Sequence, residues 1–167
     1  MRELYVPIQI SFLSYEVMTD EIEDDDGKKC IKHYVENEVR FLGAEDNGED
    51  FCEQHLSRVD FWTPAMYEQQ WREGLARIQT HDKSCLIFNM VPGYIDTWLL
   101  YKIDHNVYIQ NITFLDEYFT RKKIAYPFIT PENCYDYLLE PRMERDANGN
   151  GPSEWVVPML ARTIENR

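Results

Sequence analysis

The chain has 167 residues, and 30 Asp and Glu against 17 Lys and Arg give it a formal net charge of −13 at pH 7. Apolar residues make up 44% of the chain, which is enough to bury a core, so the surplus charge belongs to a folded domain. This charge repels nucleic acid phosphates and anionic lipid headgroups, and it attracts basic surfaces. The composition therefore excludes direct binding to nucleic acid or to a membrane and indicates a protein partner with a positive face.

The length predicts a single domain over residues 1–167, although a strand-rich N-terminal lobe over residues 1–57 is an alternative. No apolar run approaches the roughly 18 residues that a membrane span requires. The four cysteines are widely spaced, and no cleavable leader precedes the first strand-like segment. We therefore expect reduced thiols in a cytoplasmic protein.

Two alternating segments open the chain. The even positions over residues 4–12 are apolar, which predicts a strand with one buried face. The odd positions over residues 31–41 repeat this pattern, so the two segments predict an antiparallel pair. A charged turn over residues 21–26 belongs to the long acidic connection between them, and residues 43–50 form a second predicted acidic loop.

A helix is predicted from Pro64 to Gln79. Thr63 supplies an N-cap and Pro64 a first-turn proline, the strongest local start signal in the chain. Tyr67 and Trp71 begin an apolar stripe at helical spacing, which continues with Leu75 and Ile78.

Three strands are predicted over residues 84–91, 97–103 and 107–115, and their short connections favour antiparallel neighbours. Thr130-Pro131 predicts the start of a short second helix over residues 131–140, and a short strand follows over residues 154–157. The expected fold is α+β: a mostly antiparallel β-sheet with one main helix packed on a face and a short second helix.

Two patterns resemble metal sites, but neither supplies a complete set of ligands. Cys30-x-x-His33 and Cys52-x-x-His55 have the spacing of paired zinc ligands, but Cys30 and His33 fall on opposite faces of the predicted strand. Residues 146–151 resemble the opening of a calcium loop, yet Val157 stands where the closing carboxylate is required. We expect no metal and no cofactor.

No arrangement of side chains indicates catalysis. The four histidines are scattered, and there is neither a nucleophile elbow nor a glycine-rich loop that could cradle phosphate. The remaining enzymatic alternative is a small hydrolase that uses an unrecognised pair of carboxylates.

The central segment resembles a known family. It contains Asp60-Phe61-Trp62-x-Pro64, then Tyr67-x-x-Gln70-Trp71-x-x-x-Leu75, and then Asp82-Lys83-Ser84. Further similarity continues through Asp96-x-Trp98 and Tyr101 to the late Ser153-Glu154-Trp155-x-x-Pro158. These residues resemble a segment of the bacterial immunity proteins of contact-dependent growth inhibition systems, over roughly the last two-thirds of the chain.

This resemblance implies a cytoplasmic inhibitor that binds a cognate nuclease toxin one to one and covers its active site. In some such systems the toxin is a transfer RNA nuclease that works with elongation factor Tu, so a ternary assembly is conceivable. Charge supports the same interpretation, because a nuclease cleft must be basic to hold phosphates and an acidic blocker gains association rate from it. The alternative is an acidic adaptor, or nucleic acid mimic, that binds basic proteins without a dedicated toxin.

Three acidic clusters are candidate toxin contacts, although each could also be a solvated loop that keeps a sheet edge soluble. Aromatic anchors within an acidic rim would supply the affinity, and Tyr15, Tyr94, Trp98, Tyr101 and Tyr118 are the candidates. The first cluster comprises Glu21, Glu23, Asp24, Asp25 and Asp26; the second comprises Asp46, Glu49 and Asp50, with Glu53 beside them; the third comprises Tyr94, Asp96, Trp98, Asp104, Asp116 and Glu117.

Overall fold

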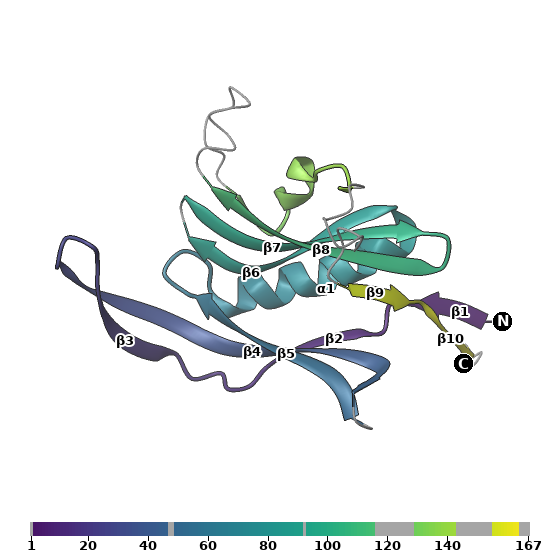
Figure 1. Ribbon diagram of the computed structural model, residues 1–167, viewed down its shortest axis with the longest axis horizontal. Helices are drawn as coiled ribbons and strands as arrows, with labels where there is room; N and C mark the ends of the chain where they lie inside the picture. The colour runs from purple at the N-terminus through teal and green to yellow at the C-terminus, as the bar shows by residue number, and fades with distance from the viewer. Residues whose placement is uncertain (1, 47–48, 92, 116–128, 143–154, 164–167) are drawn as a thin grey trace, which may run out of the picture.

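The computed structural model describes residues 2–46, 49–91, 93–115, 129–142 and 155–163. Its described part is built mainly of antiparallel sheets with one α-helix, which confirms the predicted fold class. Two four-stranded sheets form the body, and a short two-stranded ribbon joins the segments near the two chain ends (Figure 1).

The N-terminal sheet is organised around one long strand, β4. Strands β2 and β3 pair with successive parts of one edge of β4, and β5 pairs with the other edge. The predicted antiparallel pairing of the first two alternating segments is confirmed, with Ile8 opposite Phe41. The strands are β2 (Ile8–Phe12), β3 (Met18–Glu23), β4 (Lys29–Asp46) and β5 (Glu49–Arg58).

Three expectations for this region are corrected. The predicted strand over residues 4–12 is two strands, because Pro7 lacks the N–H that a continuous ladder needs; β1 (Arg2–Tyr5) pairs instead with β10 (Leu160–Thr163). The predicted turn over residues 21–26 is strand β3 as far as Glu23. The predicted acidic loop over residues 43–50 is strand on both sides of residues 47–48, since β4 and β5 continue their pairing there.

The predicted helix is confirmed as α1 (Pro64–Thr80). Thr63 has extended backbone angles, and its hydroxyl accepts a hydrogen bond from the Met66 N–H. This bond satisfies one of the N–H groups that a helix leaves unpaired at its start.

The C-terminal sheet has the order β6-β7-β8-β9, with all neighbours antiparallel. It confirms the three predicted central strands and the short strand near residue 155. Asp104, at a positive φ of 56°, lies in the two-residue turn between β7 and β8. The strands are β6 (Lys83–Val91), β7 (Tyr94–Ile103), β8 (Asn106–Leu115) and β9 (Trp155–Pro158).

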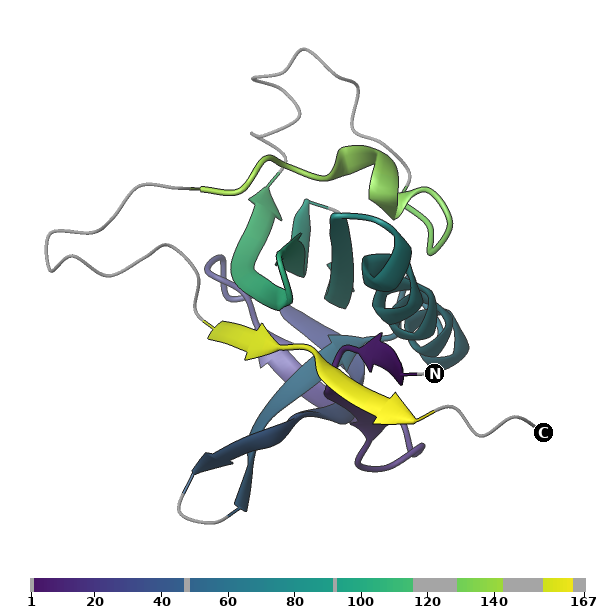
Figure 2. The same ribbon diagram turned by 90° about the vertical axis from the view of Figure 1, so that its right-hand side faces the viewer.

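Helix α1 lies beside β6, the edge strand of this sheet (Figure 2), and its side chains bond to the strand backbone. The Gln70 amide accepts from the Ile87 N–H and donates to the Cys85 carbonyl, each at 2.8 Å. Trp71 donates to the Ile87 carbonyl, and the Tyr67 hydroxyl accepts from a further amide of β6, that of Met90. These side chains satisfy backbone groups of a buried edge where another strand would otherwise have to pair.

The core between the two sheets is rich in aromatic side chains. Trp98 lies at its centre, with ring centroids 4.8 Å from Phe88, 4.7 Å from Trp155 and 5.9 Å from Phe41. One hydrophobic cluster runs from Val6 to residues of β9, so both sheets and the helix contribute to the same core.

The predicted second helix is wrong in extent. Residues 131–140 contain only the short 3₁₀-helix η1 (Cys134–Tyr137). The start signal is real, because Thr130 and Asn133 exchange side-chain to backbone hydrogen bonds, but the chain is extended again at Leu138. Tyr101 then donates to the Leu139 carbonyl, so a bond to the sheet takes the place of a second helical turn.

Candidate functional site

The first predicted acidic cluster lies on a hairpin that projects from the body of the molecule. We call residues 18–34, which comprise β3, its turn and the first part of β4, the acidic hairpin (Figure 1). It carries six carboxylates and three lysines. Every residue of β3 is exposed, so these carboxylates are available to a partner without any rearrangement of the core.

The tip of the acidic hairpin is shaped by its own side chains. The Asp24 carboxylate accepts from the backbone N–H of Lys28 at 2.7 Å and of Asp26 at 3.1 Å. Gly27 has a φ of 75°, in the left-handed region that glycine tolerates best. This bonded turn holds Asp25 and Asp26 at the exposed end, whereas Glu21 and Glu23 lie in β3.

The three lysines of the hairpin compensate half of its six carboxylate charges and leave a net charge of −3. Lys29 lies 3.6 Å from Glu21, but both side chains are well exposed, and such pairs contribute little. At the base, the Tyr34 hydroxyl donates to Asp20 at 2.7 Å, and this hydrogen bond is the main cause that raises the pKa of Tyr34.

The second predicted cluster lies at the far end of the β4–β5 pair. Asp46 is opposite Glu49 in the ladder, and Asp50 is opposite Glu45. The backbone therefore brings Asp46, Glu49 and Asp50 together as predicted, while their side chains lie outside what the structure describes. Glu53, further along β5, is half-buried, and burial raises the pKa of its carboxyl.

The third predicted cluster is dispersed by the fold. Tyr94 and Asp96 lie at the start of β7, and Asp104 follows its end, about 30 Å away at roughly 3.3 Å per residue. Tyr94 is 43% exposed, and the nearby Asp96 carboxylate raises its pKa. Asp116 and Glu117, with Tyr118, lie outside the described residues.

Two of the proposed aromatic anchors are not on the surface. Trp98 is 1% exposed and Tyr101 is 2% exposed, because both point into the packed interior. The sequence motif containing Trp98 is therefore a packing feature, and Trp98 leaves the set of candidate contact residues. Tyr15 is 76% exposed and Tyr94 stays accessible.

A partly buried imidazole lies between the two sheets. His55 stacks on Phe88 with centroids 4.3 Å apart, and its Nε2 makes no hydrogen bond within the described part of the chain. Glu53 Oε1 lies 3.5 Å from that nitrogen. Burial lowers the pKa of His55, and the opposing effect of Asp96 is smaller, so the neutral imidazole is favoured.

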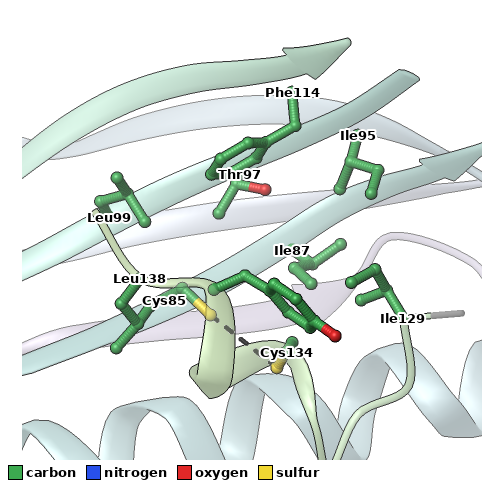
Figure 3. A pocket seen from close by; sticks show the side chains of 10 residues that line it. Cys85, Ile87, Ile95, Thr97, Leu99, Phe114, Ile129, Cys134 and Leu138 are labelled. Atoms are coloured by element: carbon green, nitrogen blue, oxygen red, sulfur yellow. Dashed lines mark hydrogen bonds between the residues drawn. The ribbon is translucent and has the colours of Figure 1, made fainter. Parts of the chain in front are cut away.

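The pocket under η1 is a packing defect rather than a ligand site. Its lining is almost entirely apolar, and its cavity volume of about 20 Å³ holds at most one water (Figure 3). Cys85 and Cys134 meet at one wall with their sulfur atoms 3.8 Å apart. The hydrogen bond with Cys134 and then burial raise the pKa of the Cys85 thiol well above its usual value, which makes it a poor nucleophile.

Within the described ranges, no group of three or more His, Cys, Asp and Glu side chains is placed to hold a metal ion. No helix in the same ranges is long and apolar enough to cross a membrane.

Sequence comparison identifies the family of this chain. The model of the CdiI N-terminal domain matches residues 57–164, which span α1, the C-terminal sheet and the segments that connect them. The chain belongs to the CdiI family of immunity proteins.

A curated relative supports this membership. The immunity protein CdiI of Enterobacter cloacae subsp. cloacae is 31% identical over 112 residues, which cover 64% of this chain and 71% of that protein. A solved chain from the CdiA-CT/CdiI toxin and immunity complex of Enterobacter cloacae has a similar fold, with a TM-score of 0.59. That likeness covers 90% of each chain at 21% identity.

The match to the CdiI model separates two kinds of residue. The residues within the match include Tyr67, Gln70 and Trp71, whose side chains bond to the backbone of β6 and so stabilise the fold. The acidic hairpin lies entirely outside the matched range. The carboxylates of the hairpin were identified from the sequence, but its exposed apolar residues were not. The pattern that could have identified them is Met18, Asp20 and Ile22, alternate residues that place apolar, acidic and apolar side chains in turn on one face of the strand.

Proposed function

We propose that this protein is the immunity partner of a CdiA-type effector, that it binds the C-terminal toxin domain of that effector, and that the toxin is a nuclease. Membership in the CdiI family carries the first part of the proposal. On this proposal the protein acts in the cytoplasm by occupying the toxin, with no cofactor and no reaction of its own.

Charge supports a nuclease as the target. A nuclease cleft must attract phosphates, so its surface is basic, and this chain has a net charge of −13. An acidic partner approaches such a cleft with electrostatic steering, which raises association rates by about 10 to 10³-fold. Fast capture is an advantage for an inhibitor, because the toxin must be bound before it cuts.

The acidic hairpin is the surface we propose for this contact, with the carboxylates at the β4–β5 end and the Tyr94–Asp96 region as further contacts. The hairpin projects from the body, and its carboxylates are exposed and only partly compensated by lysines. A projecting ribbon can enter a cleft that the flat face of a sheet cannot reach.

The test uses the C-terminal toxin domain of a CdiA-type effector, to be sought in the gene beside this one. We expect an equimolar amount of this protein to abolish the nuclease activity of that domain on RNA or DNA. Association should slow steeply as salt rises from about 0.1 M to about 1 M, where the Debye length falls from about 10 Å to about 3 Å. A domain without nuclease activity would refute the assigned toxin class, and residual cleavage at equimolar inhibitor would refute the immunity function.

Two further measurements separate related hypotheses. Recovery of several unrelated basic proteins, rather than that one domain, would favour a general acidic adaptor. Adding elongation factor Tu to the purified pair tests whether a ternary assembly forms, because a larger complex would elute earlier from a sizing column.

A further inference from the structure

The outer edge of β3 is an open strand edge. Within the described part of the chain, β3 pairs only with β4, so the backbone groups on its other side have no strand partner. Natural proteins commonly protect such edges by shortness, bulges, proline or charged side chains, above all lysine. The charged side chains of β3 are Asp20, Glu21 and Glu23, and carboxylates do not repel a basic strand. The six residues of β3, Met18–Glu23, include no lysine and no proline, and their ladder with β4 has no register shift.

The same edge exposes apolar side chains. Val17 immediately precedes β3, Met18 begins it, and Ile22 lies near its end. The three residues are 44%, 40% and 40% exposed, respectively. Met18 and Ile22 lie on one face of the ribbon with Asp20 between them, and exposed apolar side chains on a projecting ribbon are a feature of interaction surfaces. A strand docked along this edge would therefore meet the apolar Met18 and Ile22 on either side of the Asp20 carboxylate.

Charge distinguishes β3 from the opposite edge of the hairpin. Beside β3 lie the carboxylates of Asp20, Glu21 and Glu23, whereas the facing part of β4 carries Lys29 and Lys32. A basic segment is therefore attracted to the edge of β3 and not to that of β4. A second copy of this chain is disfavoured, because it would bring like carboxylates together across the new ladder.

We propose that the outer edge of β3 receives an extended, basic segment of the toxin as an additional strand, an inference that rests on the proposed function. Backbone hydrogen bonds along β3 would supply much of the affinity, and the side chains of Met18 and Ile22 would read the partner's alternate residues. The six residues of β3 offer about 20 Å of ladder at roughly 3.3 Å per residue.

The hairpin lies outside the residues that match the family model, so on this proposal it would carry the contacts specific to one toxin. Residues that build the shared fold cannot distinguish partners without cost to stability, whereas residues on the projecting ribbon can vary freely.

The binding test uses lysine substitutions on the two edges of one hairpin. The double variant M18K/I22K places lysine on the edge of β3, where it repels a basic segment and removes both apolar contacts. We expect it to weaken binding of the toxin domain about 10-fold or more. The matched comparison is between single substitutions that add the same charge. M18K and I22K should each weaken binding more than I31K, because Ile31 is 61% exposed on the β4 side of the same hairpin, and the affinity of I31K should stay within about 3-fold of wild type.

Hydrogen exchange gives a second measurement that does not depend on mutation. Amides of β3 that point away from β4 should exchange rapidly in the free protein and become protected in the complex. Equal loss of affinity in M18K, I22K and I31K, or no new protection in β3, would overturn the inference while leaving immunity intact. Failure of the wild-type protein to bind the domain would instead overturn the proposed function. A wild-type dimer abolished by M18K/I22K would identify a second copy as the occupant.

Discussion

Replacing Gln70 by leucine should strongly destabilise the protein, although leucine suits a helix and an apolar core. The Gln70 side chain is fully buried, and its amide makes both a donated and an accepted hydrogen bond with the backbone of β6, each at 2.8 Å. Leucine cannot replace either bond. The Ile87 N–H and the Cys85 carbonyl would then be buried without their partner.

The magnitude follows from those two groups. Each buried backbone group left without a partner costs about 1–3 kcal/mol, so Gln70→Leu should lower the free energy of unfolding by about 2–6 kcal/mol. A domain of this kind has about 5–15 kcal/mol in total, so the variant could approach the limit of folding.

Denaturant unfolding monitored by tryptophan fluorescence measures this loss, with the slope m checked for two-state behaviour. The control is Gln79→Leu, the same substitution at an exposed position of the same helix, which should change stability by less than about 0.5 kcal/mol. Hydrogen exchange at the Ile87 amide should accelerate in Gln70→Leu alone. A loss below about 1 kcal/mol, or an unchanged Ile87 exchange rate, would refute the edge-satisfying role of Gln70.

Three further substitutions test other parts of the fold. Gly74→Ala should destabilise by about 1–3 kcal/mol in the same unfolding assay, although alanine usually favours a helix by about 0.5–1 kcal/mol, because the new methyl group collides with the Cys85 carbonyl oxygen. Stabilisation would refute this close approach. His55 has a lowered pKa in the folded state, so the unfolded chain takes up a proton first as pH falls below about 6.5, and stability is lost down to the folded pKa. His55→Phe should remove that part of the pH dependence, whereas the exposed-site control His105→Phe should keep it; equal pH profiles for the two variants would refute the assignment. Trp62→Phe removes the hydrogen bond that the indole donates to the chain just before η1, and protease cleavage near η1 should accelerate while the global unfolding midpoint shifts less. An unchanged cleavage rate would contradict this.

Local sequence patterns correctly predicted the elements whose structure depends on residues close together in the chain. The Thr63 cap and the apolar stripe predicted α1 to within one residue at its end, since both signals lie inside the helix. The three central strands were predicted for the same reason, with short turns imposing antiparallel neighbours. The central motifs also indicated the family, because they lie within the part of the chain that matches the CdiI model.

Pairing over long distances decided the rest. The acidic segment over residues 43–50 has the composition of a loop, yet β5 pairs with β4 and draws it into a ladder. The start signal at Thr130 is followed by only one 3₁₀ turn, because bonds to the sheet extend the chain beyond it.

The sequence also could not predict which of the aromatic residues are buried. Trp98 and Tyr15 are both aromatic residues near acidic ones, and only the packing of two sheets places the first in the core and leaves the second in water. The charge and the family are carried by the chain itself, because they depend on which residues are present. Which carboxylates and apolar groups share one exposed edge depends on strand pairing, which is a property of residues far apart in the chain.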